Sequence, residues 1–493
     1  MKKAQARQGS GFAASLMWKF GERCGFAVVQ LAVQVVLARM LAPDDFGSLA
    51  VILAFVNVGT AIVQSGLNTA LIQRSDTSED DYSYVFWMSL ALGVALSALL
   101  VVFSPLAARI FKMPQIEQPL RVMSAALVMS AFISPATARL VREMNFRAIF
   151  VTSIVAAVAS GAAGILCAVS GLGLWSLVVQ QVGYYVILVV TLAGAVSWRP
   201  RATFERGRAG ELLSFGWGLL AANLIDTSYQ SLADLTVGGQ FDAEILGQMS
   251  QGKRWPQSLG YLLDGSIQPV ALSALSRLQD DPAKVKALVR KTLLAYTFVT
   301  CACMAVVAAS ANAWVALLLG AQWLPCVPFV QLYCVTYAFL PIHTTNLQAI
   351  AAMGRADLVL RLELVKKSYG IALLAFAVLV LRNVYAIAAT FVVSGLISTF
   401  VNALPNRKLF GYSALEQAAD LLPSFALAVA CAALGWSASL LGMGAMMTFA
   451  LQVVVVLGAY VGAAHALGMP GLAYAIATAK SVLAGVRGAG SMK

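Results

Sequence analysis

The chain has 493 residues, of which 60% are hydrophobic and 11% are charged, and its mean hydropathy is +0.80. A soluble domain carries roughly 25% charged residues, so the composition excludes a soluble protein and indicates an integral membrane protein. The net charge of +12 would suggest a nucleic-acid partner in a soluble protein. In a membrane protein such an excess lies mostly in short loops and sets the orientation of the spans, so we expect no nucleic-acid partner.

Long apolar runs follow one another along the sequence and predict about fourteen transmembrane helices of about 20 residues each. Only the α-helix satisfies the backbone of such a run within lipid, so the predicted fold class is an all-α polytopic membrane protein. The first run is too long for the core of a cleaved signal peptide and is expected to remain as the first helix. The predicted helices cover residues 14–39, 46–71, 83–106, 119–140, 148–170, 174–196, 211–236, 245–274, 287–310, 323–349, 357–381, 384–404, 418–439 and 444–467.

The basic residues of the loops are distributed unevenly between the two sides of the membrane. With the N-terminus in the cytoplasm, the loops predicted outside hold only Arg39, Arg109, Lys112, Arg121 and Arg382, and the loops predicted inside hold most of the others. This asymmetry follows the positive-inside rule. It predicts an even number of spans, with both termini in the cytoplasm.

A basic connection at 198–210 divides the chain into two halves of about six helices each. We therefore predict an N-lobe at 1–205, a C-lobe at 206–410, and a terminal helix pair with a cytoplasmic tail at 411–493. The halves show a weak internal repeat, in which Asp45-Phe-Gly47 corresponds to Ile245-Leu-Gly247. An even number of helices in each half makes the repeats parallel, and transporters of this kind place the substrate between the halves.

Polar residues concentrate in the first two helices of each half, which would line a cavity between the halves. A charge at the bilayer centre costs about 2.5–3.5 kcal/mol, and such residues normally mark a substrate path. The candidate substrate-binding residues are Arg23, Gln30, Asn57, Gln64 and Asn68 in the first half, and Asn223, Asp226, Lys253, Arg254, Gln257 and Asp264 in the second.

The segment at 245–281 is too charged for a helix that faces lipid. Lys253, Gln257 and Asp264 recur at helical spacing and lie on one face, with Arg254 beside them. Pro256 removes one backbone hydrogen bond, so we expect a kink there. Arginine binds phosphate through paired hydrogen bonds and lysine binds it as a point charge, which favours a site for an anionic headgroup.

Internal ion pairing is the alternative for these charges. Arg23 would then pair with Asp226 or Asp234, and Lys253 with Asp264, and each pair would only hold helices together. In the later helices, His343 could couple transport to protons, although a single histidine after Pro341 is more often a structural residue.

No enzyme motif is present, because the sequence has no HExxH, GxSxG or P-loop. We expect neither catalysis nor a cofactor or metal. The seven cysteines lie in or beside apolar segments, which predicts packing rather than a disulfide framework.

Two stretches, LARMLAPDDFGSLAVI at 37–52 and GLNTALIQR at 66–74, resemble bacterial polysaccharide and lipopolysaccharide exporters. These exporters belong to the multidrug/oligosaccharidyl-lipid/polysaccharide superfamily. REMNFR at 142–147, GLGLWSLV at 171–178, and Pro269 with the run LSRLQD at 275–280 resemble them as well. One departure is Gln248-Met249, where members often carry an aromatic pair.

The resemblance implies two six-helix lobes in a V and two further helices, in the bacterial inner membrane. It implies flipping or export of a polyprenyl-pyrophosphate-linked oligosaccharide or a related polysaccharide. The expected partners are this lipid-linked oligosaccharide, membrane lipids, a coupling ion (proton or sodium), and a polysaccharide polymerase or glycosyltransferases.

We therefore predict alternating access, with the pyrophosphate on Arg23, Lys253 and Arg254 and the sugars in the polar lumen. A cation-coupled multidrug exporter of the same superfamily is the alternative, but it would need acidic and aromatic residues for a cationic drug. A glycan ligase or polymerase would need a large catalytic external loop, which is absent. A scaffold would gain nothing from the insertion cost of buried charges.

Overall fold

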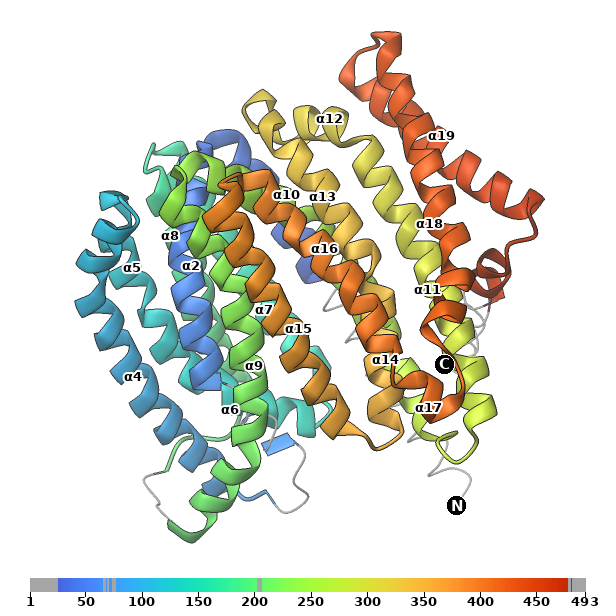
Figure 1. Cartoon of the computed structure of the whole chain (residues 1–493). Coiled ribbons are helices and arrows are strands. Elements are labelled where there is room, and N and C mark those ends of the chain that lie inside the picture. The colour runs from blue at the N-terminus through green and yellow to red at the C-terminus, as the bar shows by residue number, and fades with distance from the viewer. Residues whose placement is uncertain are drawn as a thin grey trace, which may run out of the picture. The chain divides into compact units, whose positions relative to one another are not determined.

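The computed structural model describes residues 25–64, 68, 71, 72, 77–201, 206–477 and 480. Within these ranges every regular element is a helix, as Figure 1 shows. Eleven of the helices are long and apolar enough to cross a membrane. The predicted all-α membrane fold is confirmed, and the count of fourteen spans stays a prediction.

Contacts divide the chain into two compact units that meet at Ser250 and Gln251, within one helix. Each unit is described by itself. The predicted lobes at 1–205 and 206–410 and the terminal pair at 411–493 remain predictions.

The first unit contains helices whose starts are fixed by side chains. Ser78 and Asp81 form a capping box at the start of one helix, and Asn145 accepts a backbone hydrogen bond at the start of another. The described elements are the helix Gly25–Met40, α2 (Pro43–Gln64), α4 (Glu79–Ile110), η1 (Pro114–Ile116), α5 (Glu117–Met123), α6 (Ala125–Arg142), α7 (Phe146–Val169), α8 (Leu174–Ala195), α9 (Arg206–Gln240) and the start of α10 (Ala243–Ser276).

The second unit contains the rest of α10 and the helices that follow it. Asp281 caps the next helix, which has a proline in its first turn, and Ser413 with Glu416 forms another capping box. The elements are α11 (Pro282–Ala309), α12 (Ala311–Trp314), η2 (Val315–Leu319), η3 (Ala321–Cys326), α13 (Val327–Ala338), α14 (Leu340–Ala352), α15 (Ala356–Phe376), η4 (Ala377–Leu381), α16 (Val384–Ala403), α17 (Asn406–Phe410), α18 (Ala414–Ser437), η5 (Ala438–Leu441) and α19 (Ala445–Ala466).

Two predicted spans are each divided between two α-helices. The span predicted at 119–140 is divided at Ser124 into α5 and α6, and the one at 323–349 is divided at Phe339 into α13 and α14. The charged segment predicted at 245–274 is helical throughout as α10, and the helix continues past Pro256.

One buried cluster of the first unit lies at the end where several predicted inner loops meet. Trp198 is 2% exposed, and its ring stacks on Phe132 at 6.2 Å between centroids. Close by, Arg139 bonds Glu79 at 2.5 Å, and Arg142 donates to the Leu71 carbonyl at 2.9 Å. The segments around Leu71, Arg139 and Trp198 therefore lie at one end of the helices, as the loop assignment requires.

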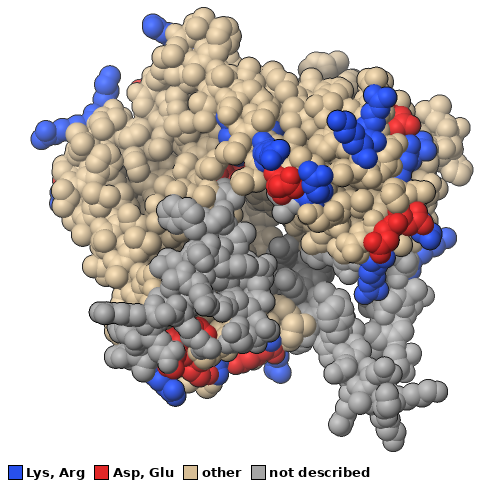
Figure 2. All heavy atoms as spheres, turned by 60° about the horizontal axis from the view of Figure 1, so that its bottom comes forward, with Lys and Arg blue, Asp and Glu red and all other residues tan. Residues whose placement is uncertain are grey.

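Charged side chains of both signs form small clusters on the face that Figure 2 presents, and most of the described surface there is neither basic nor acidic. In the second unit, one such cluster joins α11 to α18, because Arg290 bonds Asp420 at 2.6 Å and Lys286 pairs with Glu416 at 3.3 Å. Figure 1 shows α18 and α19 beside α11.

The first turns of α2 and α10 make a reciprocal contact, and the internal repeat itself stays a prediction. A Cβ added to Gly47 would overlap the Ala243 carbonyl oxygen, and one added to Gly247 would overlap the Pro43 carbonyl oxygen. Pro43 and Ala243 are separated by the same number of positions as Gly47 and Gly247, the two glycines that correspond in the predicted repeat. Only glycine lets two helix backbones approach this closely.

Candidate functional site

Two glycines place the second-unit part of α10 against α13. A Cβ added to Gly252 would lie 2.5 Å from Phe329 Cβ, and one added to Gly260 would lie 3.2 Å from Tyr337 Cδ1. Pro256, one turn from each glycine, is buried. These three residues form a strip along one side of the helix. Close packing of this strip fixes the orientation of α10 and therefore that of its charged residues.

Arg254 is the partly buried cation of α10 that has no partner among the described residues. Its side chain is partly buried, and within the described ranges it forms no hydrogen bond or ion pair. It lies about 17 Å along the axis from the start of α10. Leaving such a charge without an acidic partner is costly. Arg254 can therefore bind an anion without first breaking an internal pair.

The alternative that pairs Lys253 with Asp264 is wrong. Because α10 is helical between them, the two residues are about 17 Å apart along its axis, too far for an ion pair. Asp264 instead accepts a hydrogen bond from the Tyr296 hydroxyl of α11 at 3.2 Å. Lys253 is partly buried and has an interaction of its own.

Gln257 lies in a small polar and aromatic cluster next to Gly260. The side chains of Tyr261 and Gln257 lie next to the Tyr337 hydroxyl. The Tyr261 and Tyr337 rings meet edge to face with centroids 5.8 Å apart. Tyr261 is 47% exposed, so this cluster presents an aromatic face and hydrogen-bonding groups at its edge.

The candidate residues of the first unit lie on three helices. Gln30 and Gln64 are partly buried, and Asn57 and Asn223 are exposed. Asp226 accepts a hydrogen bond from Gln230 Nε2 at 2.7 Å. Arg23 lies outside the described residues, so its predicted pairing with Asp226 or Asp234 stays a prediction.

Asn68 is described as a partly buried residue. Its buried Oδ1 has no hydrogen-bond partner among the described residues. It can therefore accept a hydrogen bond from a ligand or from water.

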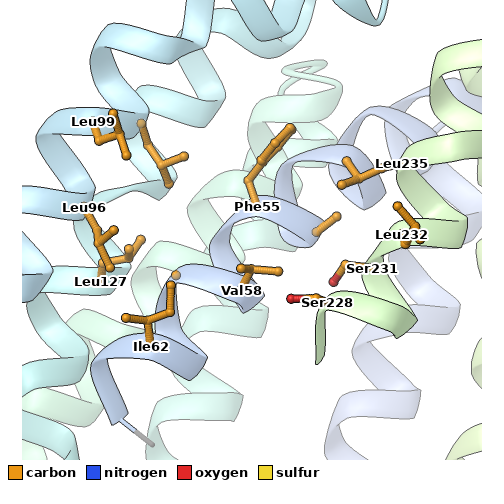
Figure 3. Close-up of a pocket in the computed structure, with 13 residues that line it drawn as sticks. Phe55, Val58, Ile62, Leu96, Leu99, Leu127, Ser228, Ser231, Leu232 and Leu235 are labelled. Atoms are coloured by element: carbon orange, nitrogen blue, oxygen red, sulfur yellow. The ribbon is translucent and has the colours of Figure 1, made fainter. Parts of the chain in front are cut away.

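An apolar pocket of about 380 Å³ lies between α2, α4, α6 and α9 in the first unit. Figure 3 shows Phe55, Val58 and Ile62 on one helix, with the hydroxyl groups of Ser228 and Ser231 nearby. A water-sized group occupies about 30 Å³, so the pocket holds about a dozen such groups. Sequence reasoning missed this pocket, because leucine-rich walls have the pattern of any buried helix face.

A cluster of buried amides in the second unit was also missed. Asn346 binds both Gln417 and Asn406, and Asn402 contacts His343. The sequence feature that could have indicated this cluster is the presence of Asn402 and Asn406 within an apolar run, on either side of Pro405.

The sequence of this chain is similar to those of known proteins. A family described as polysaccharide biosynthesis protein matches residues 36–328. The succinoglycan biosynthesis transport protein ExoT of Rhizobium meliloti (strain 1021) is 24% identical over 341 residues, which is 69% of this chain and 68% of ExoT.

Solved structures share the fold. The lipid II flippase MurJ in an inward closed conformation has a TM-score of 0.71 at 12% identity, over 92% of this chain and 99% of MurJ. An inward-facing MATE multidrug resistance transporter of the MOP superfamily has a TM-score of 0.60 at 13% identity, over 78% of this chain and 97% of that one. The family match covers more than half of the chain, which therefore belongs to the polysaccharide biosynthesis protein family and has the fold of MurJ and the MATE transporters.

Proposed function

We propose that the protein is a flippase that moves a polyprenyl-pyrophosphate-linked oligosaccharide or a related polysaccharide across the bacterial inner membrane by alternating access. The observation that carries this proposal is the guanidinium of Arg254, which is partly buried on a membrane-length helix and has no acidic partner among the described residues. A guanidinium binds two phosphate oxygens in one plane, so a pyrophosphate fits Arg254 better than a neutral or cationic substrate does.

The other candidate residues take the remaining parts of this substrate. Lys253 and Arg23 add positive charge for the second phosphate. Gln257 and Tyr261 supply amide and aromatic groups for a sugar, and the exposed Asn57 and Asn223 supply hydrogen bonds in the polar lumen. Gln30, Gln64, Asn68, Asp226 and Asp264 complete the proposed lining.

The comparisons support the same substrate class from a separate direction. ExoT is named as a succinoglycan transport protein and MurJ as a lipid II flippase. A saccharide and a lipid carrier are the two parts of the proposed substrate. Both names describe transport, which agrees with the proposal that this protein transports its substrate and is not an enzyme. The proposal also includes an inner-membrane location with both termini in the cytoplasm. It includes a proton or sodium as coupling ion, and a polymerase or glycosyltransferases as partners.

A multidrug exporter is the second candidate, because the fold also matches a MATE transporter at a TM-score of 0.60. A cationic drug needs a negative or aromatic site. Arg254 would repel it, and no acidic residue neutralises Arg254 within the described ranges. The polysaccharide substrate is therefore favoured over the drug.

The test is a flipping assay in proteoliposomes loaded with a polyprenyl-pyrophosphate oligosaccharide. A hydrogen bond to a charged group contributes about 1.5–3 kcal/mol. We therefore expect Arg254→Gln to slow flipping by about 10-fold to 150-fold, and Arg254→Lys to be slowed less. Arg277→Gln is the matched control, because Arg277 lies just beyond the end of the same helix and is exposed. Equal rates for Arg254→Gln and the wild type would reject the phosphate site.

A further inference from the structure

A second pocket, of about 640 Å³, lies in the second unit between α11, α18 and the segment that follows α19. We call it the α11–α18 pocket. Apart from Asp420 and Ser424 its walls are apolar, and they include Leu294, Pro423, Leu427, Leu467, Met469 and Pro470. The volume corresponds to about twenty groups of the size of a water molecule. A methylene group is of similar size, so the pocket has room for one acyl chain of a phospholipid.

The α11–α18 pocket lies near the ends of three apolar helices. Here α11 begins at Pro282 and α18 begins at Ala414, whereas α19 ends at Ala466. Along α18, the lining residue Asp420 is about 9 Å from the start of the helix and Leu427 is about 20 Å from it. The pocket therefore extends from the level of the charged side chains toward the apolar interior of the membrane.

The segment after α19 packs tightly against α11. A Cβ added to Gly471 would lie 3.0 Å from the Leu294 carbonyl oxygen and 3.0 Å from Phe298 Cβ. Figure 1 shows this part of the chain, in dark red, next to α11. Only a residue without a side chain lets the backbone approach this closely. The wall that this segment contributes to the pocket is therefore fixed in place.

Basic and aromatic side chains meet at the polar end of the α11–α18 pocket. Arg290 bonds the lining residue Asp420 at 2.6 Å. Lys291 Nζ lies 5.7 Å from the centre of the Tyr474 ring, and Arg290 lies near the same tyrosine. Both cations are exposed. Tyrosine, lysine and arginine are the side chains that proteins place at the headgroup level of a membrane.

The charges at this end of the pocket do not balance. Lys286 pairs with Glu416 at 3.3 Å, and Arg290 pairs with Asp420. Lys291 contacts a tyrosine ring but forms no ion pair among the described residues. A guanidinium has five N–H donors, so Arg290 keeps donors that Asp420 does not use. A headgroup with one negative charge on a phosphate therefore complements this end of the pocket.

We propose that the α11–α18 pocket binds an anionic phospholipid as a resident lipid. Arg290 and Lys291 bind its phosphate, and one acyl chain lies in the pocket along α18. Basic pockets between membrane helices recognise anionic lipid headgroups in this way. The proposal goes beyond the flippase function and does not depend on it, because Arg254 is not part of this pocket.

Other occupants fit the α11–α18 pocket less well. The C-terminal residues 481–493 contain Arg487 and Lys493 and no acidic residue, so Lys291 would repel them. A zwitterionic phospholipid would leave the charge of Lys291 unbalanced. Water would lie against walls that are mostly apolar, and apolar cavities stay dry.

The test measures phospholipid binding to the purified full-length protein in a non-ionic detergent by native mass spectrometry. The two probes are phosphatidylglycerol and phosphatidylcholine with the same oleoyl chains, which differ in the charge of the headgroup. One cation at a lipid headgroup changes the affinity about fivefold. We therefore expect phosphatidylglycerol to bind about fivefold tighter or more, and equal affinities for the two lipids would overturn the proposal.

Two pairs of variants locate the lipid. Lys291→Gln should weaken binding of phosphatidylglycerol about fivefold and leave that of phosphatidylcholine unchanged. Lys284→Gln is its control, because Lys284 lies about two turns nearer the start of α11 and bonds Asp281 at 2.9 Å. Ala426→Trp fills the pocket, since Ala426 lines it and is exposed, and should remove the preference for phosphatidylglycerol. Ala433→Trp changes an exposed position of α18 outside the lining and should keep it.

Two further measurements separate the α11–α18 pocket from the proposed substrate site. The preference for phosphatidylglycerol should persist in Arg254→Gln, and its loss there would place the lipid at Arg254 and overturn the proposal. Polyprenyl phosphate should not displace phosphatidylglycerol from this variant, because displacement would assign the pocket to the substrate. A preference that survives unchanged in Lys291→Gln would also overturn the proposal. Lys291 is exposed, so that variant decides the matter even if Ala426→Trp does not fold.

Discussion

The reciprocal contact of Gly47 and Gly247 leads to a prediction with a definite sign. Gly47→Ala places a methyl group on the Ala243 carbonyl oxygen, and Gly247→Ala places one on the Pro43 carbonyl oxygen. The obstacle in each case is backbone on the facing helix, which cannot move aside as the end of a flexible side chain can. The first turns of α2 and α10 must therefore separate in either variant.

The size of the effect follows from two opposing contributions. Overpacking typically costs about 1–3 kcal/mol, while replacing a helical glycine with alanine stabilises a helix by about 0.5–1 kcal/mol. Each single variant should lose about 1 kcal/mol of unfolding free energy, and at most about 2.5 kcal/mol. Because the contact is reciprocal, the two losses should be similar. The double variant should lose less than their sum, since the first alanine already opens the gap.

Thermal unfolding of the purified protein, followed by tryptophan fluorescence, measures these differences. Gly194→Ala is the matched control, because Gly194 lies in α8 and a Cβ there would meet nothing within 4 Å. We expect this control to raise the midpoint slightly, opposite in sign to Gly47→Ala. If Gly47→Ala were as stable as the control, or if the two losses were fully additive, the close reciprocal contact would be refuted.

Two other contacts give predictions of their own. Tyr296→Phe removes the donor 3.2 Å from Asp264, and it should lower the unfolding free energy measured by denaturant titration by about 1–2 kcal/mol; an unchanged value would show that the bond contributes nothing. The pKa of Asp281 lies below its ordinary value, first because of the hydrogen bond from the Lys284 side chain. Since the folded pKa is below the unfolded value of about 3.9, this stabilisation is present at pH 7 and is lost as pH falls through the folded pKa. The midpoint of Asp281→Ala should therefore be lower than that of the wild type at pH 7, and the difference should shrink as pH falls through the folded pKa of Asp281; a difference that does not change with pH would contradict the assignment.

Hydropathy predicted the helices well because a long apolar run has one way to satisfy its backbone in lipid. The helix predicted at 148–170 is Phe146–Val169, and the one predicted at 174–196 is Leu174–Ala195. The charged α10 was predicted at 245–274 and spans Ala243–Ser276. Hydropathy did not predict the division at Ser124, because averaging over a span removes the signal of a local break.

The site was less accessible to sequence reasoning, because its contacts join distant positions. Helical spacing places Lys253 and Asp264 on one face, but the 11 positions between them amount to about 17 Å along the helix axis, so they cannot pair. The partners of Asn346 lie 71 and 60 positions away, at Gln417 and Asn406. A single amide in an apolar run has no local pattern, so only the folded chain brings these residues together.

The reciprocal form of the contact between α2 and α10 has a consequence for the origin of the chain. In an isologous dimer, a residue on one subunit touches a second position on the other, and the reverse contact is also made. Pro43 with Gly247 and Ala243 with Gly47 follow that rule within one polypeptide. A gene encoding a single half would have produced a self-complementary subunit, and duplication with fusion would have preserved its dimer interface as an internal seam. Fusion also frees the two copies to diverge, and the second copy carries the partly buried Arg254.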